Sequence, residues 1–95
     1  MIRHVVFFTA LHQSDLQRVE DGLRLLENNP HGRVKISRNM RKDALSTEID
    51  LVVYGEFADE AELAAYKAHP IYQQSIDAVR PLRDLRIAAD FTAEI

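Results

Sequence analysis

The chain contains no cysteine and no tryptophan, and it has only three glycines and three prolines in 95 residues. Without cysteine there are no disulfides, thiolate metal ligands or cysteine nucleophiles, which is typical of a reducing compartment. The scarcity of glycine and proline, together with 46% hydrophobic and 28% charged residues, excludes a fibrous or disordered chain. The length predicts one domain over residues 1–95.

Positive charge is not in excess either, because the formal net charge is -3. No global field therefore attracts nucleic acid or anionic lipid. No apolar run approaches the roughly 20 residues that span a bilayer. The segment Met1–Val5 has no signal-peptide pattern. The sequence predicts a cytoplasmic protein with no nucleic-acid partner and no membrane partner.

Hydrophobic periodicity predicts alternating strands and helices. The expected strands cover residues 2–8, 33–41, 49–57 and 85–91. One helix is expected to begin at Ser14 with a capping box to Gln17, and another at Asp59 with a capping box to Glu62. Pro70 should interrupt the second helix, which resumes over residues 71–79.

The order β-α-β-β-α-β predicts an α+β, ferredoxin-like fold, with a four-stranded antiparallel sheet and both helices on one face. The other face would then be bare, yet it carries Val5, Phe7, Val52 and Tyr54. Such a contiguous apolar patch is unusual on a soluble monomer. We therefore expect a homodimer in which two chains pack through their sheet faces.

Several segments along the chain resemble one known family. The most specific are Asp50–Phe57 (DLVVYGEF) and the run Tyr66-Lys-Ala-His69-Pro70-Ile-Tyr72. The opening IRHVVF, the Val79–Leu82 segment VRPL, and Ala89-Asp90-Phe91 agree with them. Over nearly its whole length the chain resembles the stress-responsive A/B barrel domain family, called Dabb.

This resemblance implies a dimeric α+β barrel with a pocket between the sheet and the helices of each chain. Some relatives are enzymes, namely a polyketide cyclase and a hydroxynitrile lyase, and others have no assigned activity. In the cyclase-type relatives the motif ends His-Pro-x-His, and its last His is the catalytic base. Here that position is Tyr72. A phenol with a pKa of about 10 is a poor base, so the cyclase mechanism does not carry over.

The inward-facing strand positions and the family motif together predict the residues that line the pocket. These are His4, Val6, Leu51, Val53, Tyr66, His69 and Tyr72. The candidates for catalysis are His4, His69 and Tyr72, although no catalytic residue is assigned. The two histidines have structural alternatives, His4 as a buried, hydrogen-bonded core residue and His69 as a residue that caps or kinks the helix. The Tyr72 hydroxyl could still orient a ligand or donate a proton. Arg38 could reach an anionic ligand or lie along the surface, and Arg80 is expected to pair with Asp77 or Asp84.

No cofactor and no metal are expected, because the four histidines lack metal-ligand spacing and no phosphate loop or dinucleotide motif is present. Two functions remain open. One is a protein that binds a small apolar or aromatic ligand. The alternative is a cofactor-free enzyme, of cyclase, lyase or monooxygenase type, acting on a carbonyl or polyketide-like substrate through His4 or His69 with a tyrosine hydroxyl. A third possibility is a stress-linked protein that acts through its dimer surface.

Overall fold

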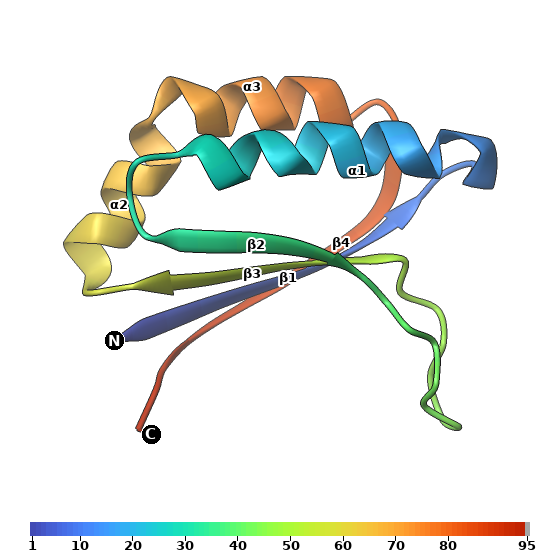
Figure 1. The fold of residues 1–95 in the computed structure, drawn as a ribbon, viewed down its shortest axis with the longest axis horizontal. Coiled ribbons are helices and arrows are strands. Elements are labelled where there is room, and N and C mark those ends of the chain that lie inside the picture. The colour runs from blue at the N-terminus through green and yellow to red at the C-terminus, as the bar shows by residue number, and fades with distance from the viewer. Residues whose placement is uncertain (95) are drawn as a thin grey trace.

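Helices cover one face of a single antiparallel sheet in the computed structural model, which describes residues 1–94 (Figure 1). The strand order is β2-β3-β1-β4. Together with the element order, this confirms the ferredoxin-like β-α-β-β-α-β fold. The strands are β1 (Ile2–Ala10), β2 (Arg33–Arg38), β3 (Leu51–Phe57) and β4 (Arg83–Thr92). The helices are α1 (Leu16–Arg24), α2 (Glu60–Ala68) and α3 (Pro70–Val79), with 3-10 turns η1 (Gln13–Asp15) and η2 (Leu25–Asn28) flanking α1.

Alternation along the two central strands builds the core. In β3, the burial alternates residue by residue from Leu51 to Phe57, and in β1 it does so over His4, Val6 and Phe8. These are the helix-facing positions that the period of two predicts. Val6 pairs with Val53 across the two strands, beneath the buried α1 residues. Among residues 1–94, no helix is both long and apolar enough to cross a membrane.

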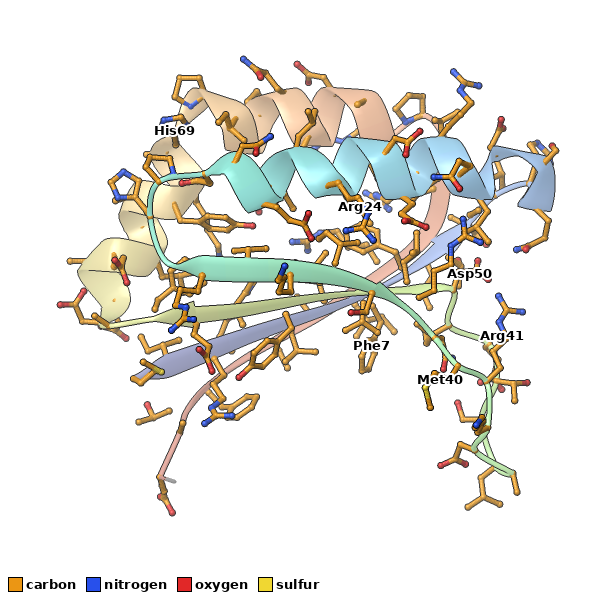
Figure 2. All side chains as sticks on the ribbon, viewed as in Figure 1. Phe7, Arg24, Met40, Arg41, Asp50 and His69 are labelled. Carbon is orange, nitrogen blue, oxygen red and sulfur yellow. The ribbon has the colours of Figure 1, made fainter. Side chains whose placement is uncertain are left out.

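Strand boundaries differ from the prediction around Asp50. The second strand ends at Arg38 rather than at residue 41, and Arg41 itself has a φ of 57°, outside the β region. The third begins at Leu51 rather than at residue 49. Buried Asp50 accepts a hydrogen bond from the Ala10 amide at 2.9 Å and pairs with Arg41. Figure 2 shows this pair where the 39–50 segment leaves the sheet.

The helix starts confirm one capping prediction and overturn another. Asp59 accepts from the Glu62 amide at 2.8 Å, as expected for the second helix. The box expected at Ser14 is wrong, because Ser14 lies inside the 3-10 turn η1 and α1 begins at Leu16 without a side-chain cap. Pro70 interrupts the second helix as predicted and becomes the first residue of α3.

Arg38 holds β2 against the first helix rather than reaching a ligand. Its guanidinium is paired with the nearly buried carboxylate of Glu20, which Arg24 also contacts at 3.0 Å. The hydrogen bond from Arg38 holds the pKa of Glu20 below its usual range. The partner of Arg38 is therefore an internal carboxylate, not a ligand at the cavity, which Arg38 does not line.

Candidate functional site

A cavity of about 430 Å³ lies between the inner face of the sheet and the helical layer, with lining residues from α1, η2, α2 and α3. This volume is in the lower part of the range of roughly 300–1,000 Å³ that holds small molecules. Its apolar walls come from both layers: Val6, Phe8, Leu23, Leu26, Val53, Ile76 and Val79. Its polar and aromatic lining consists of His4, Tyr66, Lys67, Tyr72, Ser75, Arg80, Arg83 and Arg86.

His4 belongs to the polar lining. The antiparallel register of β1 and β4 places it opposite Asp90, and its Nδ1 is hydrogen-bonded to the Asp90 carboxylate. The imidazole is 2% exposed, whereas the carboxylate is 40% exposed. In the neutral tautomer that donates from Nδ1 to the carboxylate, the ring carries its lone pair on Nε2. Within residues 1–94, Nε2 makes no hydrogen bond, so in that tautomer its lone pair is not used by the protein.

Tyr66 brings a phenol to the same cavity. Its side chain is fully buried, and no described residue lies within hydrogen-bonding distance of its hydroxyl. Burial raises the pKa of this hydroxyl, with a smaller contribution from Tyr72 in the same direction. The phenol is therefore a neutral hydrogen-bond donor throughout the physiological pH range. Its ring lies 6.2 Å from the imidazole of His4 and 5.2 Å from the ring of Tyr72, measured between centroids.

The structure brings His4, Val6, Val53, Tyr66 and Tyr72 together around the cavity, as the sequence-based pocket has them. The two other residues of that pocket lie elsewhere. Leu51 is completely enclosed in the core and does not line the cavity.

His69 has the capping role that was its structural alternative. It lies at the junction of α2 and α3 (Figure 2), and its Nδ1 accepts from the Ile71 amide at 3.1 Å. Its ring is 6.0 Å from that of His31 and does not line the cavity. Of the two histidines considered for catalysis, only His4 reaches the cavity.

Sequence reasoning missed most of the charged lining. Arg83 and Arg86 come from β4, Arg80 from the end of α3, and Lys67 from α2. Arg80 forms no ion pair with Asp77 or Asp84 among the described residues, contrary to expectation. A signal was present, because placing Leu85 and Ile87 on the outer face of the fourth strand puts Arg86 and Asp90 on the inner one.

Residues that could hold a metal do not gather in the described part of the chain. Within residues 1–94, no group of three or more histidine, aspartate or glutamate side chains is close enough to bind an ion. The chemistry available to this cavity from its own side chains is therefore proton transfer, hydrogen bonding and charge pairing.

Comparison with known families and folds agrees with this architecture. The model of the family described as Stress responsive A/B Barrel Domain, or Dabb, matches residues 2–93. A comparison with curated proteins gives no match. A Dabb family protein from Mesorhizobium loti with a ferredoxin-like fold has 22% identity and a TM-score of 0.78, over 97% of this chain and 95% of that chain.

Two further solved structures have the same fold. A dimeric ferredoxin-like protein of unknown function from Thermobifida fusca has 21% identity and a TM-score of 0.78, over 97% of this chain and 90% of that chain. SnoaB, a cofactor-independent oxygenase from Streptomyces nogalater, has 18% identity and a TM-score of 0.70, over 99% of this chain and 93% of that chain. At these identities the likeness concerns the fold alone.

The isolated hydroxyl of Tyr66 predicts an unusual change in stability. Because a buried polar group without a partner costs about 1–3 kcal/mol, Tyr66→Phe should raise the free energy of unfolding by about 1 kcal/mol. Tyr54→Phe is the matched control, since the Tyr54 hydroxyl accepts from Arg3 and donates to Glu56 at 2.8 Å. That variant should lose stability. Urea denaturation of both variants measures whether each substitution raises or lowers the free energy of unfolding. A loss of stability in Tyr66→Phe as large as that in Tyr54→Phe would contradict this account.

Proposed function

The chain belongs to the stress-responsive A/B barrel domain family, and we propose that its cavity binds a small, largely aromatic or apolar carbonyl compound from which His4 removes a proton without a cofactor. The observation that carries this proposal is the buried imidazole, which is bonded to a carboxylate through Nδ1 and faces the cavity. A carboxylate at Nδ1 orients the ring and stabilises the imidazolium that forms when Nε2 accepts a proton.

The proposed step is the deprotonation of a carbon next to a carbonyl group. The C–H bond breaks, the proton passes to Nε2 of His4, and the electron pair moves onto the carbonyl oxygen as an enolate. The Tyr66 hydroxyl donates a hydrogen bond to that oxygen, where negative charge develops. Return of the proton from Nε2 to carbon or oxygen completes the cycle with no change of oxidation state. Tyr72 lines the cavity beside Tyr66 and positions the ligand.

Two features favour proton transfer over binding alone. The phenol and the imidazole converge on one cavity from different layers, and among residues 1–94 neither has a protein partner at the atom that the step uses. Burial also keeps the phenol protonated by raising its pKa, as a hydrogen-bond donor to an enolate requires. A non-catalytic protein that binds a small apolar or aromatic ligand remains the second candidate, and the apolar walls support it.

Deuterium exchange tests the proposed step directly. Phenylpyruvate is aromatic and enolisable, and loss of its C3 proton signals in D2O is followed by NMR. The protein should accelerate this loss, and His4→Asn should slow the catalysed rate about 10²- to 10⁴-fold, the usual contribution of a general base. Asp90→Asn should give an exchange rate between those of wild type and His4→Asn. Tyr66→Phe should slow exchange about 10²-fold.

His12→Asn is the matched control, because His12 is an exposed histidine outside the cavity. In the presence of this variant, phenylpyruvate should lose its C3 protons at the wild-type rate. Exchange that is equally fast in wild type and His4→Asn would remove His4 from the chemistry. If phenylpyruvate then bound without accelerated exchange, the binding function alone would stand.

We also propose that two copies of the chain pair through the outer sheet face. This face carries Phe7, which is 39% exposed, and Ile87 and Phe91, which are 53% and 49% exposed. Figure 2 shows Phe7 and Met40 on the side away from the helices. Solved relatives from Thermobifida fusca and Jannaschia sp. are described as dimeric. Pairing would cover apolar surface that a small monomer otherwise exposes.

Sedimentation of a charge variant tests this pairing. Wild type should sediment with the mass of two chains at micromolar concentration, and Phe7→Glu should sediment as one chain, because the interface would bury its carboxylate. Leu11→Glu, at an apolar residue that is 54% exposed beyond the end of β1, should stay dimeric. A monomeric wild type, or a dimeric Phe7→Glu variant, would contradict pairing through this face.

A further inference from the structure

The lining of the cavity has a charge imbalance that proton transfer does not use. Lys67, Arg80, Arg83 and Arg86 line it, and none of the aspartates and glutamates in the described part of the chain does. The chain as a whole has a net charge of -3. Positive charge is therefore concentrated at this cavity against the overall sign of the protein, and a cavity lined by one sign of charge attracts a ligand of the other.

Two of these cations have a structural explanation. Lys67 lies in the last turn of α2, and Arg80 follows the last residue of α3. Both positions complement the negative end of a helix dipole. Arg83 and Arg86 have no such role, because they belong to β4.

The two β4 arginines also lack a carboxylate partner. Arg18, Arg24, Arg38 and Arg41 each form an ion pair with an aspartate or glutamate. Within residues 1–94, Arg83 and Arg86 form none, and the Arg83 guanidinium donates a hydrogen bond to the Asp84 carbonyl oxygen at 3.0 Å. Their guanidinium groups can therefore still form an ion pair with an anionic ligand, whereas those four arginines already pair with a carboxylate of the chain.

Arg86 is directed at the cavity by its register. It lies opposite Phe8 on the inner face, and its guanidinium carbon is 6.0 Å from the centroid of the Phe8 ring. Its charge lowers the pKa of the Tyr66 hydroxyl, against the larger opposite effect of burial. The positive charge of Arg86 therefore influences the part of the cavity where the Tyr66 hydroxyl lies.

We propose that Arg83 and Arg86 recognise a carboxylate, so that the molecule taken by the cavity is a small aromatic or acyl carboxylate. This rests on the proposed function, because it assigns the substrate class of the same cavity. The guanidinium fork matches a carboxylate through two parallel hydrogen bonds. The apolar part of the ligand packs on Val6, Leu23 and Ile76, and its carboxylate meets β4.

A phosphate fits this site less well. Phosphate sites are usually built from backbone N–H groups at a helix N-terminus or a glycine-rich loop. Here the cavity is lined along α3, from Tyr72 in its first turn to Val79 at its end, and no glycine is among the described lining residues. A singly charged carboxylate is therefore favoured over a doubly charged phosphate.

Binding of an unreactive matched pair tests the assignment. 4-Phenylbutanoate and 4-phenylbutan-1-ol share the apolar part and differ in the carboxylate, and neither carries the reactive carbonyl of the proposed step. In calorimetric titrations at low salt, wild type should bind the carboxylate at least about 10-fold more tightly than the alcohol. Arg83→Gln and Arg86→Gln should each reduce this preference severalfold while leaving the affinity for the alcohol unchanged.

Arg18→Gln is the matched control, because it removes the same charge from an exposed position on α1. It should keep the full preference. Equal affinities for the carboxylate and the alcohol in wild type would overturn the assignment. An equal loss of the carboxylate preference in Arg18→Gln and Arg86→Gln would also overturn it, because the preference would then depend only on the overall charge of the protein. Tighter binding of phenyl phosphate than of the carboxylate would also overturn it.

The same titrations separate this inference from the proposed function. A carboxylate preference that depends on Arg83 and Arg86, in a protein that does not accelerate exchange of phenylpyruvate, would support carboxylate recognition and reject the base chemistry. Accelerated exchange that depends on His4, with no preference for the carboxylate over the alcohol, would support the base chemistry and reject carboxylate recognition. His4→Asn should retain the carboxylate preference, since Arg83 and Arg86 are intact.

Discussion

The register between β1 and β4 is the constraint on which the chemistry of this chain depends. It sets His4 opposite Asp90 and Phe8 opposite Arg86, all on the helix-facing side. Because side chains alternate along a strand, a slip of one residue would move Asp90 and Arg86 to the other face. The hydrogen bond between His4 and Asp90 is therefore a consequence of strand pairing, and it links a buried imidazole to a carboxylate that is 40% exposed.

The cavity follows from incomplete coverage of the sheet. The central strands β1 and β3 have their inner faces buried, whereas nearly every residue of the edge strand β4 is exposed. Side chains on the inner face of β4 can then carry charge, and Arg86 and Asp90 do. An apolar wall, a phenol with a raised pKa and two arginines that have no carboxylate partner within residues 1–94 thus lie around one cavity. This combination suits a small molecule with one anionic end and one enolisable carbonyl group.

Much of the fold could be predicted from alternation and from the resemblance, because β1 and β3 are regular and the second helix carries a true capping box at Asp59. The end of the second strand could not, since it depends on the positive φ of Arg41 and on the buried Asp50. The site was harder to predict because it is built by long-range pairing. His4 was recognisable as an inward-facing residue, but its partner lies 86 positions away. Arg38 and Arg86 both point inward, and only packing decides which one has a carboxylate beside it.

The protonation of His4 tests the central claim most directly. In long-range proton–nitrogen NMR spectra of the ¹⁵N-labelled protein at pH 8, the His4 ring is assigned by the signals that disappear in His4→Asn. The account predicts a neutral ring with its proton on Nδ1, where Asp90 accepts it, and a bare Nε2 available to a substrate. A ring protonated on Nε2 would have no lone pair to offer in the cavity and would contradict the proposed role of His4 as a base.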